Sequence, residues 1–349
     1  MHKAVDILHT TGYDLYILNH TSAHPSGGYI VYNALKKSKY SSSLAITIER
    51  HISDESTFLY PYGQHHPQEV KTPDEVAKGL PPHKVLVVYG EEFSPEQLRA
   101  IHLEHKSTII MVMMTHDLIS GGCAYPRTPN LHSGDVRKIS CEGFQKDCGR
   151  CPEIPLKKPN PRDKTFRLLK RKKENFKGLP IILVGASSYS LSIAEKSSVF
   201  KGIRKELLPI LHDVPYCEHS AQEIKQSLQI PTDKKIILWG TTQPESIRKG
   251  KVLMDEVLNY LWDMMTTKER ENTQLLCVGP VPVTPFQQTQ KFHVNYSGYL
   301  PTREHMAMMY KASDVSVCTT VSDAGPMMVT ESLTNECPVV GFDRSVILD

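Results

Sequence analysis

The sequence predicts an α/β fold made of two similar domains. The 349 residues are about twice the ~150 residues of an average domain, so each domain is long enough to bury its own core. Short apolar runs typical of buried strands alternate with helical stretches, which favours mainly parallel sheets. This alternation starts again in the last third of the chain, so we expect α/β domains over residues 1–217 and 218–349.

The first domain begins with an expected strand over residues 14–19, followed by a polar, glycine-bearing turn and a helical stretch over residues 29–37. Ser94, Pro95 and Glu96 are typical of the start of a helix. Further strands are expected over residues 44–48, 85–89, 108–114 and 181–184.

The second domain follows a segment, residues 210–226, in which proline and polar side chains interrupt the strand pattern. Strands are expected over residues 235–240, 274–279, 293–297, 314–319 and 338–342, and helices over residues 251–265 and 303–312. Two such domains bind ligands at the carboxyl ends of their strands, in a cleft between the domains.

Composition excludes several classes of protein. Hydrophobic residues make up 40% and charged residues 23%, which excludes collagen, coiled coils and disordered chains. With 41 basic against 38 acidic residues, a nucleic acid or a membrane would have to bind a local patch. The apolar run over residues 109–114 is far shorter than the ~20 residues of a membrane-spanning helix. Because residues 1–14 lack the apolar core of a signal peptide, we expect a cytoplasmic protein.

An acidic motif lies in the last quarter of the chain, where Asp323 and Glu331 are separated by seven residues. Pro326 is suited to the first position of a helix, so Gly325 and the amides just inside that helix present N–H groups to an anion or to sugar hydroxyls. The carboxylate of Glu331 lies on this helix and can accept hydrogen bonds from two ribose hydroxyls. The alternative interpretation is a solvated glutamate and a turn-forming aspartate.

Two further motifs favour binding of phosphate. Arg248 and Lys249 follow the strand over residues 235–240 and open a helix, where a lysine is a good point charge for phosphate. After the first strand, Gly27 and Gly28 allow a ligand to approach the backbone closely. The alternatives are solvated surface cations and a plain strand-to-helix turn.

The three motifs occur in the order seen in retaining glycosyltransferases of the GT-B fold. The stretch SGYLPTREHMAMMYKASDVSVCTTVSDAGPMMVTESLTNECPVVGFD resembles the most characteristic region of glycosyltransferase family 4. The stretches THDLISGGCAYPR and CEGFQKDCGRCP resemble a subgroup that builds exopolysaccharide and O-antigen chains, including colanic-acid-type transferases. The resemblance implies a GT-B fold, in which two Rossmann-like domains face each other across a cleft.

The resemblance also implies roles for individual residues. Glu331 would bind the donor ribose, and Asp323 would lie near the donor sugar together with the backbone of residues 325–327. Lys249 would hold the diphosphate and stabilise its charge as it leaves, which needs no metal or other cofactor. His116 follows the strand expected over residues 108–114 and matches the family's active-site histidine beside the reacting sugar; the alternative is a structural histidine. The resemblance thus gives His116 and Asp323 as catalytic residues, and the following as donor-binding residues: Gly27, Gly28, Arg248, Lys249, Gly325, Pro326, Met327 and Glu331.

The sequence departs from the family pattern in three places. Asp323 stands where many members carry glutamate, and Gln243 stands where many carry a second basic residue, so Arg248 is the expected substitute. The family's second domain continues beyond the strand of PVVGFD with a terminal helix. We therefore expect the second domain to be truncated at its C-terminus.

Four of the eight cysteines lie within 29 positions, namely Cys123, Cys141, Cys148 and Cys151. In a reducing compartment such clustering favours a metal over disulfides. Cys148 and Cys151 are spaced as two ligands on one turn, and the other two cysteines would complete a structural zinc site in a cysteine-rich loop over residues 121–152, with His132 as an alternative ligand. The other interpretation is four reduced thiols packed in an irregular loop.

Residues 167–177 carry six basic side chains in eleven positions, on an expected helix. They are either a solvated helix face or a contact with anionic lipid head groups, which suits a membrane-held acceptor. Nucleic acid is not expected, because no aromatic residues are interleaved for stacking.

The leading hypothesis is therefore a retaining transferase that moves a sugar from a nucleotide-diphosphate donor to a growing surface polysaccharide or a lipid-linked glycan. A nucleotide-sugar 2-epimerase of the same architecture is one alternative. A non-catalytic nucleotide-binding fragment is another.

Overall fold

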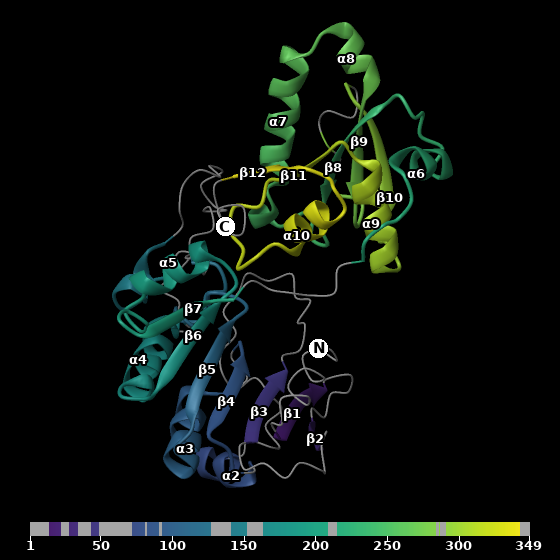
Figure 1. Ribbon diagram of the computed structural model, residues 1–349. Helices are drawn as coiled ribbons and strands as arrows, with labels where there is room; N and C mark the ends of the chain where they lie inside the picture. Colours follow the sequence, from purple (N-terminus) through teal and green to yellow (C-terminus); the bar gives the residue numbers. More distant parts are fainter. Residues whose placement is uncertain are drawn as a thin grey trace. The chain divides into compact units, whose positions relative to one another are not determined.

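The chain forms two α/β units, each built around a mainly parallel sheet, as the sequence predicts (Figure 1). We describe them from a computed structural model, over residues 14–21, 28–33, 43–48, 72–80, 82–90, 93–126, 141–151, 163–208, 215–283, 286 and 291–342. Unit 1 contains strands β1–β7 and unit 2 contains strands β8–β12.

Unit 1 has a seven-stranded sheet in the order β2-β1-β3-β4-β5-β6-β7. The strands are β1 (Asp14–Thr21), β2 (Gly28–Asn33), β3 (Ser43–Ile48), β4 (Val85–Tyr89), β5 (Thr108–Met113), β6 (Ile181–Gly185) and β7 (Arg204–Leu207). The helices are α2 (Pro73–Gly79), α3 (Pro95–His105), α4 (Thr165–Phe176) and α5 (Ser188–Lys196), with a short 3₁₀ turn η2 (Gly143–Gln145). All described strand pairs are parallel except β1 with β2.

Strand β2 corrects one expectation. The helix expected over residues 29–37 is wrong for residues 29–33, which pair antiparallel with β1, so that Gly28 lies opposite Thr21. The sequence YIVYN is rich in aromatic and β-branched residues, which favour strands, and the edge of β1 supplies partners for its backbone. Residues 34–37 lie outside the described residues.

Helix α3 begins where the sequence predicts and is fixed by its cap. The side chain of Ser94 accepts a hydrogen bond from the backbone N–H of Gln97, while the Gln97 side chain accepts one from the backbone N–H of Ser94. On the adjacent strand β5, Ile109, Met111 and Met113 alternate with less buried residues and are fully buried in the core of unit 1.

Unit 2 has a five-stranded parallel sheet in the order β10-β9-β8-β11-β12. The strands are β8 (Lys235–Gly240), β9 (Thr273–Val278), β10 (His293–Gly298), β11 (Val315–Cys318) and β12 (Val339–Gly341). The helices are α6 (Ala221–Ser227), α7 (Lys251–Met264), α8 (Thr267–Asn272), α9 (Arg303–Ala312) and α10 (Met327–Thr334), with a 3₁₀ turn η3 (Ile247–Lys249).

The central strand β8 is buried on both faces, as parallel strands covered by helices are. Ile237 and Trp239 pack in the same cluster as Met254 and Leu258 of α7. The alternate residues Ile236 and Leu238 pack with Met309 and Tyr310 of α9. The strand order reverses between β8 and β11, so the segments that follow these two strands meet at the carboxyl edge of the sheet. Among the described helices, none has both the length and the apolar sequence that crossing a membrane requires.

Candidate functional site

A carboxylate with two cations lies at this carboxyl edge of unit 2. Arg248 and Lys249 come from η3, after β8, and Asp323 comes from the loop after β11. Arg248 Nη1 and Lys249 Nζ each lie 2.8 Å from the same oxygen, Asp323 Oδ2. The three side chains are only 13%, 18% and 15% exposed, respectively. The structure therefore brings together three of the residues that the sequence singled out, from positions about 75 residues apart.

Backbone contacts fix the position of the two cations. Val321 N donates to Arg248 O over 2.8 Å, and Thr319 Oγ1 donates to Lys249 O over 3.0 Å. Trp239 Nε1 in turn donates to Thr319 Oγ1 over 2.9 Å. These bonds tie η3 to the end of β11, so the cations are held in place before any ligand binds.

Gly250 allows the end of η3 to lie close to the backbone of Thr319, at the end of β11. It has a φ of 71°, which is unfavourable for residues with a Cβ. A Cβ at this position would also lie 2.0 Å from the backbone oxygen of Thr319. Gly250 is therefore a structural requirement of the cation pair, and the sequence analysis did not assign it a role.

The electrostatics of the site keep Asp323 ionised. Burial opposes the charge, but the nearby Lys249 and Arg248 outweigh it and lower the pKa of Asp323 to about 2. Gly325 N also donates to Asp323 Oδ1 over 3.3 Å. Asp323 is thus an anion at neutral pH that occupies the place between two cations.

Helix α10 starts beside this carboxylate. Pro326 is expected to be the first residue of this helix, but it is the N-cap, so the helix begins one residue later. Its side chain makes no capping hydrogen bond to the first turn. Its first helical residue is Met327, so the amides of the first turn are the groups that this end of the helix offers to an anion.

Glu331 lies in the second turn of α10 and is held by a tyrosine. Tyr310 is fully buried on α9, and its hydroxyl donates to Glu331 Oε2 over 3.2 Å. Burial raises the pKa of Tyr310 well above its ordinary value, and the Glu331 charge raises it further. Tyr310 therefore stays protonated and positions the glutamate. Single motifs do not predict this pair, because the partners lie on different helices.

His116 lies in unit 1, in the loop that follows β5. It is fully buried, and its Nε2 lies 3.2 Å from Ser190 Oγ, which belongs to the start of α5. His116 N donates to Ala124 O over 2.7 Å, and the Tyr125 ring meets the histidine edge-on. The sheet order explains this contact. Strands β5 and β6 are parallel neighbours, His116 follows the carboxyl end of β5, and Ser190 follows the carboxyl end of β6.

A buried lysine holds the His116 loop. Lys172 of α4 is fully buried, and its ammonium group donates to the backbone oxygens of Asp117 and Ser120, the latter over 2.8 Å. The carbonyl groups satisfy the buried cation. Lys172 is therefore not one of the solvent-exposed basic residues of α4.

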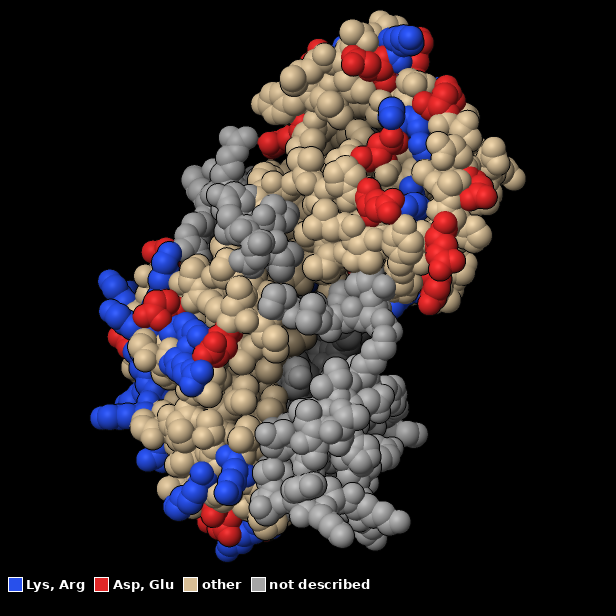
Figure 2. All heavy atoms as spheres, viewed as in Figure 1, with Lys and Arg blue, Asp and Glu red and all other residues tan. Residues whose placement is uncertain are grey.

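The other basic residues of α4 divide into two groups. Arg171 forms a two-pronged ion pair with Glu96 over 2.8 and 2.6 Å, and Lys173 pairs with Asp147 over 2.9 Å. Arg167 is exposed, and Lys170 is exposed and lies 3.8 Å from the carboxylate of the exposed Glu174. Figure 2 shows Lys and Arg side chains gathered over the part of unit 1 that carries α3 and α4. The expectation of a helix over this stretch is confirmed.

That Gly27 and Gly28 face the diphosphate stays a prediction. Gly27 and the alternative metal ligand His132 lie outside the described residues. Gly28 is the first residue of the edge strand β2 in unit 1.

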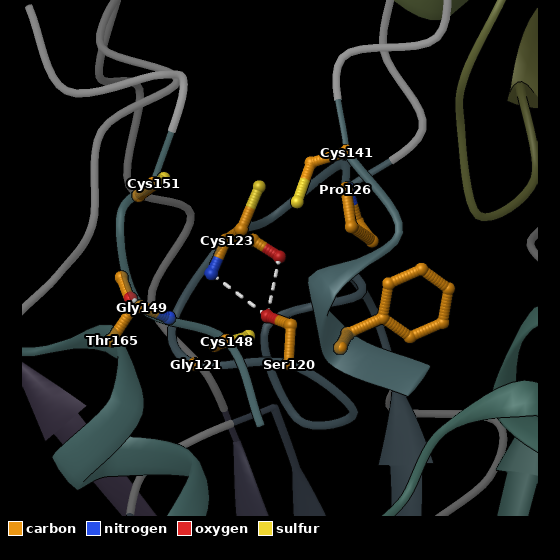
Figure 3. A pocket seen from close by; sticks show the side chains of 10 residues that line it. Ser120, Gly121, Cys123, Pro126, Cys141, Cys148, Gly149, Cys151 and Thr165 are labelled. Carbon is orange, nitrogen blue, oxygen red and sulfur yellow. Dashed lines mark hydrogen bonds between the residues drawn. The ribbon is translucent and has the colours of Figure 1, made fainter. Parts of the chain in front are cut away.

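The four clustered cysteines line one small pocket of unit 1, next to the His116 loop (Figure 3). Burial raises the pKa of the Cys148 thiol to about 11. Within the ranges that the structure describes, no three side chains of the metal-binding types already surround a common point.

No family model and no curated protein matches this chain. Solved structures are similar to it in fold. Sucrose-phosphate synthase from Thermosynechococcus elongatus has 13% identity and a TM-score of 0.47, over 87% of this chain and 71% of the synthase. HepE from Anabaena in complex with UDP-glucose has 11% identity and a TM-score of 0.49, over 88% and 74% of the two chains. WaaG, a glycosyltransferase involved in lipopolysaccharide biosynthesis, has 15% identity and a TM-score of 0.43, over 76% and 74%.

Proposed function

We propose that this chain is a retaining glycosyltransferase that takes a sugar from a nucleotide-diphosphate donor bound by unit 2. The observation that carries the proposal is the placement of Arg248 and Lys249 on one oxygen of Asp323 at the carboxyl edge of the sheet. Open parallel sheets bind their ligands at this edge, where the strand order reverses.

The chemistry of the site suits a diphosphate. Two fixed cations can each take an oxygen of neighbouring phosphates, and the first-turn amides of α10 add neutral donors. In the structure Asp323 supplies the negative charge that these cations need. A bound diphosphate would share them with Asp323, which leaves the carboxylate beside the donor sugar.

Glu331 suits the ribose of such a donor. It lies four residues beyond Met327, the first residue of α10, which is ~6 Å along a helix axis. Its Oε2 accepts the Tyr310 hydroxyl, which fixes the carboxylate, and a carboxylate can accept hydrogen bonds from two sugar hydroxyls.

In the proposed reaction the acceptor hydroxyl attacks the face of the sugar from which the diphosphate leaves, and the departing diphosphate takes the proton. Lys249, Arg248 and the α10 amides stabilise the charge that grows on the leaving group. One preorganised donor of this kind contributes about 3–4 kcal/mol. We assign His116 to the reacting sugar, on the resemblance to family 4 and on its buried position after β5.

The acceptor we propose is a growing surface polysaccharide or a lipid-linked glycan, made in the cytoplasm at the inner face of the membrane. The exposed Arg167 and Lys170 support contact with anionic lipid, and Phe166 beside them is 48% exposed. Lys172, Arg171 and Lys173 do not add to this contact, because carbonyls and carboxylates of unit 1 hold them.

The donor site is tested by thermal unfolding of the chain with UDP, GDP, ADP and their common sugar conjugates. One base should raise the melting temperature selectively, because a ligand that binds only the folded state stabilises it. Glu331→Gln should abolish this increase, whereas the exposed Glu271→Gln should retain it. An equal increase with Glu331→Gln would contradict the ribose assignment.

The reaction itself is tested by release of nucleoside diphosphate. A transferase should release it far faster when a glycan acceptor is added. A 2-epimerase would change the sugar without needing an acceptor, and a non-catalytic fragment would bind nucleotide without any release. Either of these results would overturn the proposed transfer.

A further inference from the structure

We propose that the four cysteines around the pocket of unit 1 bind one zinc ion, as a structural site that fastens the cysteine-rich loop. The inference does not depend on the cation pair, because all four cysteines belong to unit 1, whereas Arg248, Lys249, Asp323 and Glu331 belong to unit 2.

The pocket brings together three segments that are separated in sequence. Cys123 comes from the end of the His116 loop, Cys141 precedes η2, and Cys148 and Cys151 come from the loop after η2. In Figure 3, the side chains of Cys123 and Cys141 extend toward one another, with Cys148 and Cys151 on the turn along another side of the pocket. The pocket measures about 20 Å³, which is room for a single ion or one water molecule.

Cys141 is held close to the turn that carries Cys148. Its sulfur accepts a hydrogen bond from the backbone N–H of Gly143 over 3.0 Å. A Cβ at Gly143 would lie 3.2 Å from this sulfur and 3.3 Å from the Cα of Cys148. The absence of a side chain at Gly143 therefore lets the two cysteine segments come close together.

The turn that carries Cys148 and Cys151 has an unusual backbone. Cys148, Gly149 and Arg150 have φ angles of 55°, 87° and 50°, and the two that are not glycine occupy a region that L-residues rarely adopt. Hydrogen bonds hold this conformation: Gly149 N donates to Thr165 Oγ1 over 2.9 Å, and Cys151 N donates to Asp163 Oδ2 over 2.8 Å. The fold thus holds two cysteines of a C-x-x-C motif on one turn beside the pocket.

Four sulfur ligands are the donor set of a structural zinc site, in which Zn²⁺ is bound tetrahedrally at about 2.3 Å from each sulfur. The sulfurs of the described residues do not yet converge on one point. Each cysteine has a single torsion with three staggered positions, so the sulfurs can turn into the pocket while their Cα atoms stay in place. Binding then releases the thiol protons to solvent.

A zinc ion here would fix the loop that carries His116. Ser120 Oγ accepts from Cys123 N and donates to Cys123 O, both over 2.8 Å, so Cys123 is tied to the middle of that loop. Ser120 O also accepts from Lys172. The ion would thus link the His116 loop to the cysteine turn and, through Asp163 and Thr165, to the start of α4.

The test is the metal content of the full chain, purified with a reductant and without a chelator. We expect about one zinc per chain by elemental mass spectrometry. Cys148→Ser and Cys151→Ser should each lower the zinc content at least ~10-fold. Cys217→Ala is the matched control, because Cys217 is a buried cysteine of unit 2 that uses only its backbone N–H to bond Asn335, and it should retain the zinc.

A measurement on the unaltered chain keeps the test decisive if a variant fails to fold. The metal-stripped protein is titrated with Co²⁺, which should produce the near-ultraviolet absorption of cobalt thiolates, and with Zn²⁺, which should protect four thiols from a thiol reagent. Metal-free protein whose thiols stay reactive in excess Zn²⁺ would overturn the proposal. A disulfide between any two of the four cysteines, found by peptide mass spectrometry of the native chain, would also overturn it.

Discussion

Replacing Asp323 by asparagine removes one charge from the site at nearly constant volume. Its pKa is lowered from 3.8 to about 2, and a difference of ~1.8 pKa units corresponds to ~2.4 kcal/mol of stability at neutral pH. The variant also leaves Arg248 and Lys249 largely buried without their carboxylate. Removing one partner of a buried ion pair costs about 3–5 kcal/mol. We therefore expect Asp323→Asn to lower the free energy of unfolding of unit 2 by about 2–5 kcal/mol.

The sign of the pH dependence follows from the same shift. Because the folded state has the lower pKa, the contribution of Asp323 is fully present above about pH 4 and is lost as the pH falls towards 2. The difference between the wild type and the variant should fall to roughly half at about pH 3. Asp263→Asn, at an exposed position of α7, should change the stability little at any pH.

The assay is urea unfolding followed by tryptophan fluorescence. The chain has two tryptophans, Trp239 in β8 and Trp262 in α7, so the emission reports on unit 2. With a slope of ~2 kcal/mol per molar urea, the midpoint should fall by at least ~1 M. Inorganic pyrophosphate should stabilise Asp323→Asn more than the wild type, because the two cations then lack a competing carboxylate. A variant with an unchanged midpoint at neutral pH would refute the reasoning.

Three other predictions concern Lys249, Gly250 and the exposed basic side chains of α4. Lys249→Ala should lower the rate of acceptor-dependent release of nucleoside diphosphate at least ~100-fold, and a rate near that of the wild type would remove Lys249 from the leaving-group role. Gly250→Ala should lower the free energy of unfolding of unit 2 by about 2–5 kcal/mol, because it adds a positive φ and a contact with the Thr319 oxygen. Gly178→Ala in unit 1 is the control: Gly178 has a φ of 78°, but no atom lies within 4 Å of an added Cβ. This variant should lower the free energy of unfolding by only ~1–2 kcal/mol, measured by urea unfolding followed by circular dichroism. Reversing Arg167 and Lys170 to glutamate should weaken sedimentation with phosphatidylglycerol vesicles at least ~30-fold; an absence of wild-type binding would exclude the lipid contact.

Much of the fold could be predicted from local sequence. Buried parallel strands are continuous apolar runs, so β5 and β8 were located to within about one residue. Ser94 and Pro95, a capping residue followed by proline, predict the start of α3. The helix expected over residues 303–312 coincides with α9. Strand β2 was missed because its pairing with β1 decides the structure of a segment whose local pattern also fits a helix.

The members of the candidate site could be predicted, but their contacts could not. Asp323 and Arg248 each follow a strand, which placed them at the carboxyl edge of the sheet. That one carboxylate oxygen would accept from both Arg248 and Lys249 depends on β8 and β11 being neighbours, and on the absence of a side chain at Gly250. The Tyr310 to Glu331 bond depends in the same way on the packing of α9 against α10. Such contacts are set by tertiary structure, which the spacing of single motifs does not contain.

The position of β8 between β9 and β11 also has a consequence for synthesis on the ribosome. Arg248 and Lys249 are made about 75 residues before Asp323, which at ~5–20 residues per second is an interval of ~4–15 s. During this interval β8 can pair with β9, but the edge that will receive β11 stays open. A nascent chain at this stage has an unpaired strand edge and two cations without their carboxylate. The edge of β8 is paired, and the cations are neutralised, only when the segment around residues 315–323 emerges.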